Sequence, residues 1–141
     1  VRCGLEQLST NDGSLVLRYQ HGRRAFLFPG DIENKSEALL LRQGTEVSAD
    51  VLLAAHHGSI TSTGKDFLTA VAPQLIVVSA GKYGQRHYPA PENFSIWQEL
   101  GIPVHITRDQ GTMTCMTDGE ELECLGYNLN IASEPKFLFR H

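Results

Sequence analysis

The pattern of apolar and polar positions predicts a β-hairpin near the start of the chain. Residues 14–19 alternate well enough to form a strand, and the turn sequence Asn11-Asp12-Gly13 precedes them. A second turn at His21-Gly22 leads to the apolar residues 25–28, which return against the first strand and end at Pro29-Gly30. We therefore expect two antiparallel strands joined by a tight turn.

Strand-like and helical patterns alternate after this hairpin. Continuous apolar runs, typical of strands covered on both faces, occupy residues 51–55 and 75–79. Helical spacing with flanking Gly, Pro or capping residues is found at residues 36–43, 66–72 and 90–100. Shorter strands are predicted at residues 103–106, 112–116 and 122–124, and residues 126–141 show no pattern. The order strand, helix, strand, helix predicts an α/β fold with parallel pairing.

The composition restricts the class of protein. The chain has 141 residues, of which 41% are hydrophobic, so one compact domain is expected. Its formal net charge of -4 argues against a module that binds nucleic acid through a broad basic face. The longest apolar runs fall far short of the ~20 residues that span a bilayer, and the first four residues do not resemble a signal peptide. We expect a soluble domain that binds any polyanion at a local site.

The chain contains three cysteines, Cys3, Cys115 and Cys124, and none of them forms a Cys-x-x-Cys pair. This spacing indicates neither a disulfide framework nor a structural zinc cluster. We predict buried, reduced thiols. A disulfide between Cys115 and Cys124 across a hairpin is the alternative.

Side chains that ligate metals follow three successive predicted strands. Asp31 comes after the second strand, His56 and His57 after the third, and His87 after the fourth. Because the carboxyl ends of strands in an open α/β sheet form the crevice where ligands bind, these side chains are expected at one rim. Carboxylate oxygen and imidazole nitrogen are ligands for zinc or manganese, and two such ions suit phosphodiester hydrolysis. The sequence predicts a metal site of Asp31, His57 and His87, with His56 and His57 as catalytic candidates.

A segment rich in hydroxyl groups adjoins the two histidines. Ser59, Thr61 and Ser62 precede a predicted helix, where backbone N–H groups and hydroxyls bind phosphate. Gly58 lets the backbone approach this phosphate site closely. Each feature also has a structural interpretation, since Pro-Gly-Asp is a common turn and hydroxyl-rich helix caps are frequent. The occurrence of all of them together favours the functional interpretation.

Two motifs at a particular separation indicate a family. Gly30-Asp31-Ile32-Glu33 followed by His56-His57-Gly58-Ser59 resembles the metallo-β-lactamase-type domain of the ComEC-like competence proteins, a family of DNA-uptake channels. The resemblance continues through Val78-Ser79-Ala80-Gly81 and the spaced Gly101, Thr107 and Gly111, and spans about residues 14–116.

The resemblance implies an αβ/βα sandwich with a metal site at one edge that hydrolyses phosphodiesters in the DNA strand that is not imported. By motif, Asp31 corresponds to a carboxylate that bridges two metal ions, and His56 or His57 to a ligand or a transition-state acid. His87 corresponds to a late histidine ligand. It departs from the family's Tyr-Gly-His-Pro pattern, because two residues are inserted before it and Tyr88 separates it from Pro89.

The family's first metal motif, His-x-His-x-Asp-His or His-x-Asp-x-Asp-His, is absent and is expected to precede Val1. We therefore expect residues 1–125 to be the C-terminal half of the domain, an α/β half-sandwich with a mixed sheet flanked by helices, and residues 126–141 to be a tail. The complete domain is expected to hold two divalent metal ions, zinc or manganese, whereas this chain alone is expected to bind metal weakly or not at all and to be inactive.

The expected partners follow from the same resemblance. They are single-stranded DNA, the preceding half of the domain and the transmembrane channel of a bacterial plasma-membrane protein. Since half a sandwich exposes one apolar sheet face, a homo-oligomer of the chain alone is also expected. The resemblance suggests that the domain lies on the extracytoplasmic side of the membrane.

Two further hypotheses stay open from the sequence. In the first, the domain is a non-catalytic module that binds DNA or gates the channel, and the unusual His87 segment marks the loss of a ligand. In the second, it is a metallohydrolase for a small substrate unrelated to DNA, because the acidic composition gives no positive support for a polyanion.

Overall fold

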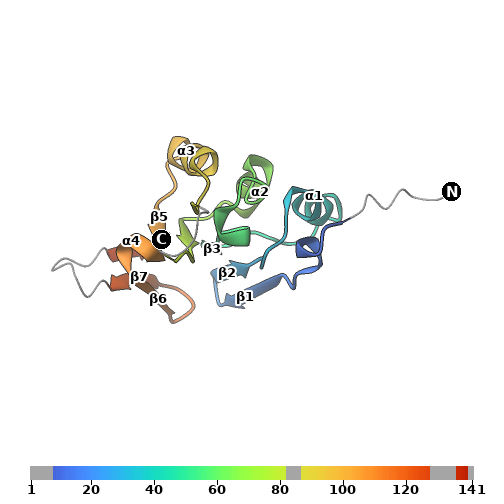
Figure 1. Cartoon of the computed structure of the whole chain (residues 1–141). Helices are drawn as coiled ribbons and strands as arrows, with labels where there is room; N and C mark the ends of the chain where they lie inside the picture. The colour runs from blue at the N-terminus through green and yellow to red at the C-terminus, as the bar shows by residue number, and fades with distance from the viewer. Residues whose placement is uncertain (1–7, 82–86, 128–135, 140–141) are drawn as a thin grey trace.

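The computed structural model describes residues 8–81, 87–127 and 136–139, which form two β-sheets with helices on one side (Figure 1). The larger sheet has the order β1 (Leu17–His21), β2 (Arg24–Phe28), β3 (Val51–Leu53), β4 (Leu75–Val78), β5 (Val104–Ile106). The smaller sheet has the order β6 (Thr112–Thr117), β7 (Leu122–Tyr127), β8 (Lys136–Phe139). The helices are α1 (Asn34–Arg42), α2 (Lys65–Val71), α3 (Pro91–Glu99) and the single turn α4 (Thr107–Gln110), with short 3-10 segments at Asn11–Gly13 and Ala55–Gly58.

The larger sheet confirms the predicted α/β class. β1 pairs antiparallel with β2, as the hairpin pattern predicts, and β2, β3, β4 and β5 pair parallel in chain order. The helices α1, α2 and α3 each connect one parallel strand to the next and lie on the same face of the sheet (Figure 1). This follows because crossovers between parallel strands share one handedness. The result is a mixed sheet with helices on one face, compatible with half of an αβ/βα sandwich.

The main core lies between this sheet and the three helices. Three neighbouring positions on adjacent strands, Leu27, Leu52 and Ile76, face the helices. Their side chains are almost completely buried. They pack in one cluster with Phe67 of α2 and Trp97 of α3. Since β7 packs on the other face of β3 and β4, both faces of these strands are covered, which explains their continuous apolar runs.

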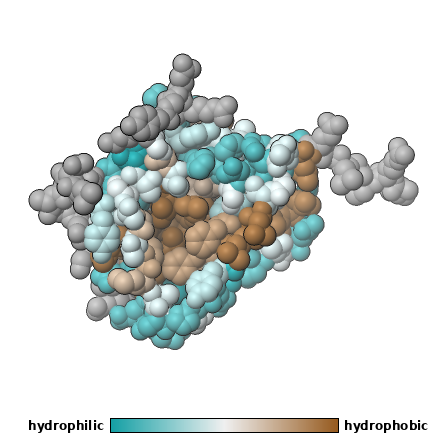
Figure 2. All heavy atoms as spheres, turned by 60° about the horizontal axis from the view of Figure 1, so that its bottom comes forward, coloured by the Kyte–Doolittle hydropathy of each residue, from teal (hydrophilic) through white to brown (hydrophobic). Residues whose placement is uncertain are grey.

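The opposite face of the larger sheet is covered only in part. Val51 and Leu75 pack against Leu122 and Cys124 of β7. Further along the same face, the cross-strand partners Leu17, Tyr19, Phe26 and Phe28 belong to the β1–β2 hairpin, and three of them, Leu17, Tyr19 and Phe28, are exposed. Figure 2, which looks onto this side, shows a continuous apolar patch. The smaller sheet therefore leaves an uncovered apolar surface over the hairpin.

The turn of the β6–β7 hairpin is fixed to the β1–β2 hairpin. The backbone N–H of Arg23 donates to the carbonyl of Gly119 (2.7 Å), and the Arg24 guanidinium donates to the carbonyl of Glu120 (2.7 Å). Gly22 lies so close to Gly119 that a Cβ on Gly22 would stand 2.5 Å from the Gly119 oxygen. Contact at this distance requires glycine at position 22.

Two features of the second sheet differ from the sequence predictions. The prediction of reduced thiols is wrong for Cys115 and Cys124, which form a disulfide, so the alternative pairing across a hairpin holds. Cys3 lies outside the described residues. Residues 136–139 form β8 along β7, although no pattern was found in residues 126–141. Spacing along the chain does not reveal either feature, because both depend on strand register.

None of the helices in the described ranges combines the length and apolarity needed to cross a bilayer.

Candidate functional site

The two adjacent histidines sit in an unusual backbone conformation directly after β3. His56 has φ 48° and His57 has φ 58°, both in the left-handed region that side chains other than glycine rarely adopt. Such residues cost of order 1–3 kcal/mol each and cluster at functional sites. Hydrogen bonds hold the turn in place, from the His56 N–H to the Gly30 carbonyl (3.0 Å) and from the Ala55 N–H to the Thr63 hydroxyl (2.9 Å). The strained turn therefore points to a function of this histidine pair.

The ring of His57 is oriented by the end of the neighbouring strand. Its Nδ1 lies 2.7 Å from the carbonyl oxygen of Ser79, directly after β4. Because a carbonyl only accepts hydrogen bonds, Nδ1 carries the proton in this contact and Nε2 is the nitrogen with a free lone pair. His57 is exposed, so Nε2 can ligate a metal ion or exchange a proton.

His56 is half-buried beside a carboxylate. The His56 Nδ1 lies 3.6 Å from Glu33 Oε1 and 3.5 Å from the Asn11 amide nitrogen. Glu33 Oε1 also accepts a hydrogen bond from the Thr61 hydroxyl (3.1 Å). The ring of Tyr88 lies 6.1 Å from the His56 ring and 5.7 Å from the His57 ring, measured between centroids. Sequence reasoning assigned no role to Glu33 or Tyr88. Their signal was position alone, since Glu33 stands two residues after Asp31 and Tyr88 follows His87.

Of the three predicted metal ligands, Asp31 and His57 follow β2 and β3 closely, whereas His87 stands nearer to α3 than to the end of β4. Asp31 is half-buried after β2, and its N–H donates to the Ser14 hydroxyl (3.2 Å). His87 is exposed and precedes α3. Within residues 8–81, 87–127 and 136–139, no group of three or more His, Cys, Asp or Glu side chains is arranged to hold a metal ion. The metal roles of Asp31, His57 and His87 stay predictions.

The hydroxyl-rich segment divides into surface and interior residues. The hydroxyls of Ser59 and Thr61 lie 3.2 Å apart on the outside of the loop, whereas the buried Ser62 hydroxyl donates to the carbonyl of Ile32 (2.9 Å). The Asn93 amide of α3 holds the loop by donating to the carbonyls of Ser59 (2.6 Å) and Ser62 (2.9 Å). The phosphate-binding role of Ser59, Thr61, Ser62 and Gly58 stays a prediction, and Ser62 in addition stabilises the loop.

Carboxylates on both sides of the loop are held by backbone donors. Glu37 of α1 accepts from the N–H groups of Thr63 and Gly64, and burial raises the pKa of its carboxyl group. Burial also acts to raise the pKa of Asp12, but hydrogen bonds from Ser9 and the Glu33 N–H outweigh it and lower that pKa to about 2. Asp12 is therefore charged at neutral pH and fixes the segment that carries Glu33.

Gly58 is required by both its conformation and its surroundings. It has φ 80°, and a Cβ there would lie 2.7 Å from Pro89 Cβ and 2.9 Å from the Trp97 ring. Gly101 has a similar φ of 70° with no heavy atom within 4 Å of the same position. Gly101→Ala is therefore expected to lower the free energy of unfolding by roughly 1–2 kcal/mol, the cost of the left-handed backbone alone. Gly58→Ala is expected to lower it by about 1–3 kcal/mol more, because the added methyl group overpacks the core.

Urea denaturation of the two variants measures this difference. Equal losses of unfolding free energy would show that the Pro89 and Trp97 contacts place no limit on position 58.

No family model matches the chain. Among curated proteins, the chain is 34% identical over 105 residues to "ComE operon protein 3" of Bacillus subtilis, an alignment that covers 74% of this chain and 14% of that protein. It is 33% identical over 90 residues to "Recombination protein 2" of Haemophilus influenzae, covering 64% of the chain and 11% of that protein. It is 36% identical over 85 residues to "Competence protein ComA" of Neisseria gonorrhoeae, covering 60% of the chain and 12% of that protein.

These relatives indicate a competence-related protein family, which confirms the resemblance at that level. The chain spans 11–14% of the length of the three curated relatives.

Proposed function

We propose that the chain acts in natural transformation as the later half of a metal-dependent nuclease domain, which degrades the DNA strand that is not imported. The observation that carries this proposal is the strained pair His56-His57, with the His57 ring fixed by the Ser79 carbonyl at the carboxyl ends of β3 and β4. The relatives support the biological setting, since one of them is named a competence protein. The metallo-β-lactamase-type fold is part of the same proposal.

The donor set suits hard or borderline divalent ions. Asp31 offers carboxylate oxygen, and His57 and His87 offer imidazole nitrogen, which are ligand types of zinc and manganese. Two such ions, held by these residues together with ligands from the rest of the domain, would supply the Lewis acidity for phosphodiester hydrolysis. Because each catalytic zinc ion takes three protein ligands, these three residues would not suffice for two ions, and further ligands from the proposed preceding half of the domain would complete the site.

The chain's own residues position the substrate and move protons. The hydrogen bond from His57 Nδ1 to Ser79 keeps Nε2 directed away from the strand. His56, whose Nδ1 lies 3.6 Å from Glu33 Oε1, is the group proposed to donate a proton to the leaving oxygen. The surface hydroxyls of Ser59 and Thr61 are placed to donate to a phosphate of single-stranded DNA.

The apolar surface over β1 and β2 is proposed to pack against the preceding half of the domain that this proposal includes. Leu17 and Tyr19 are each 53% exposed there, which is unusual for a sheet face that is buried elsewhere in the same sheet. In the chain alone, the same surface is expected to form a homo-oligomer.

The disulfide supports a location on the extracytoplasmic side of the membrane. Disulfides form and persist in oxidising environments and are rare in the bacterial cytosol. The Cys115–Cys124 bond is therefore in accord with a domain that meets DNA before it crosses the membrane.

The substitution His57→Gln tests the catalytic part of the proposal. In the domain completed by its preceding half, His57→Gln is expected to slow cleavage of single-stranded DNA about 10²–10³-fold, within the range that a positioned acid or base contributes. His21→Gln is the matched control, because His21 is also exposed but lies at the end of β1. Rates of release from end-labelled DNA are compared at equal metal content. Equal rates for wild type and His57→Gln would sink the catalytic role.

A second candidate is a non-catalytic module that binds DNA or gates a channel. The observation that favours it is the exposed His87, which stands in a segment that departs from the family pattern. This candidate predicts retention of single-stranded DNA by the complete domain without cleavage in zinc or manganese.

A further inference from the structure

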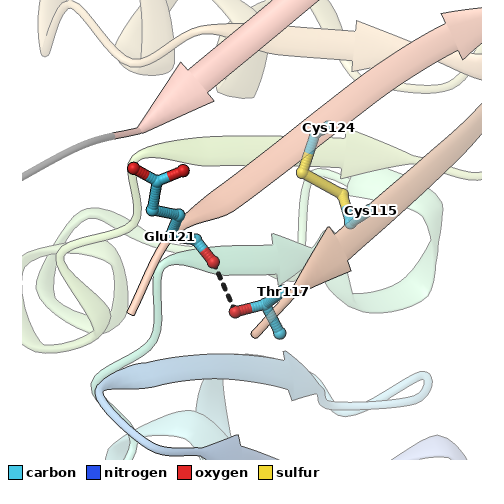
Figure 3. The surroundings of a disulfide bond; sticks show 4 residues. All are labelled: Cys115, Thr117, Glu121 and Cys124. Carbon is cyan, nitrogen blue, oxygen red and sulfur yellow. Dashed lines mark hydrogen bonds between the residues drawn. A yellow bond between two sulfur atoms is a disulfide. The ribbon is translucent and has the colours of Figure 1, made fainter. Parts of the chain in front are cut away.

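The two cysteines of the disulfide lie at directly opposed positions of the β6–β7 hairpin (Figure 3). Their Cα atoms are 4.1 Å apart, and nine residues separate them in the sequence. Cys124 is completely buried, whereas Cys115 is half-buried. Cys115 is therefore the less buried of the two residues, although it packs against the same small cluster as Cys124.

The turn that joins the two strands is held by its own hydrogen bonds. The Thr117 hydroxyl donates to the Glu121 carbonyl (2.5 Å) and accepts from the Gly119 N–H (2.9 Å). Asp118 accepts from the N–H groups of Glu120 (2.9 Å) and Glu121 (2.8 Å), and these bonds lower the pKa of its carboxyl group. The turn needs no disulfide to form, so it keeps the two cysteines in register when they are reduced.

The hairpin is also the cover of one part of the larger sheet. Leu122 and Cys124 pack on Val51 and Leu75, with only a small cluster of neighbours around them. The main core on the helix side is much larger and does not include the hairpin. Loosening of the hairpin would therefore uncover apolar area without unfolding the rest of the chain.

We propose that Cys115–Cys124 is a thiol–disulfide exchange site that locks the two strands of the β6–β7 hairpin, the cover of the larger sheet, to each other. A dithiol reductant attacks the sulfur of Cys115, the less buried residue of the pair. The S–S bond breaks, Cys124 leaves as a thiolate, and a mixed disulfide forms at Cys115. The second thiol of the reductant then displaces Cys115, so the chain gains two thiols and the reductant becomes a disulfide. In the reverse direction, a protein disulfide of an oxidising compartment accepts the two electrons and closes the lock.

The disulfide controls how much of the apolar face of the larger sheet, on the side opposite the helices, is exposed to solvent. With the disulfide closed, the surface over β1 and β2, with Leu17, Tyr19 and Phe28, is uncovered. With it open, Val51 and Leu75 become accessible beside that surface. This inference does not depend on the proposed nuclease, since it uses none of the residues of the proposed metal site.

Hydrogen exchange of the chain, followed by mass spectrometry before and after treatment with tris(2-carboxyethyl)phosphine, tests the lock. A disulfide that closes a short loop restricts opening, and its reduction is expected to speed exchange of the β6 and β7 amides about 30-fold. The amides of β3 and β4 are an internal control, because strand pairing in the larger sheet protects them independently. Binding of an apolar dye is expected to rise with reduction. Unchanged exchange in β6 and β7 would overturn the proposal.

Two variants separate the lock from side effects of the reductant. In a Cys3→Ser background, Cys115→Ser is expected to exchange like the reduced chain and to show no response to the reductant. A small reagent with a single thiol cannot complete the reduction, so a limiting amount of it is expected to stay attached as a mixed disulfide at Cys115. A variant that still responds to reduction, or a mixed disulfide found at Cys124, would contradict the assigned exchange site.

Discussion

Asp31→Ala in the complete domain is expected to reduce metal-dependent cleavage of single-stranded DNA by roughly three orders of magnitude or more, because removal of one member of a cooperating catalytic set loses most of its effect. In the proposed site, this carboxylate would help to hold both divalent ions, so its loss would weaken the binding of both. Asp31 is half-buried in a loop after β2 and is not part of the main core. The variant is therefore expected to fold.

The control for this prediction is Asp66→Ala. Asp66 is an exposed carboxylate in the first turn of α2, and its removal changes charge by the same amount. Cleavage rate, metal content by mass spectrometry and the midpoint of thermal unfolding are measured for both variants. Wild-type cleavage by Asp31→Ala, with two metal ions still bound, would show that the carboxylate is not a ligand.

Asp50→Ala is expected to destabilise the chain by about 3–5 kcal/mol, as is typical when one partner of a buried ion pair is removed. Arg24 and Asp50 are 3.1 Å apart, with side-chain exposures of 3% and 12%. Asp50 also accepts from the Ala25 N–H (2.8 Å) and the Gln74 amide (2.7 Å), so it joins the starts of β2, β3 and β4. The substitution removes the carboxylate from all three donors.

Urea denaturation of Asp50→Ala and Glu120→Ala checks this prediction. Glu120 pairs with Arg23 at 3.3 Å, but both side chains are mostly exposed, at 68% and 77%. Exposed pairs contribute little, so Glu120→Ala is expected to have a far smaller effect. Similar unfolding free energies for the two variants would mean that burial does not strengthen the Arg24–Asp50 pair.

Much of the larger sheet was predictable because its signals are local. The apolar runs that form β3 and β4 lie between helical patterns, and the hairpin of β1 and β2 has clear turn residues. The sequence analysis did not predict the four-residue helix α4 or the strand β8, since neither has a periodic pattern of its own. The disulfide was given as the alternative only, because its formation depends on the register of β6 and β7.

The candidate site was predictable in its residue types but not in its contacts. Asp31 and the two histidines stand at strand ends, which the order of elements predicts. The left-handed backbone at His56 and His57 and the Ser79 carbonyl that orients His57 are properties of the folded chain. Ser62 shows the opposite case, because a hydroxyl in a polar segment turned out to be buried on the Ile32 carbonyl.

Metal content and cleavage of single-stranded DNA by the complete domain, measured beside the 141-residue chain, test the central claim most directly. The account predicts about two divalent ions per complete domain in a two-metal site, cleavage that a chelator stops, and no cleavage by the chain alone. A complete domain that binds single-stranded DNA, contains no metal and leaves the DNA intact after zinc or manganese is added would contradict it.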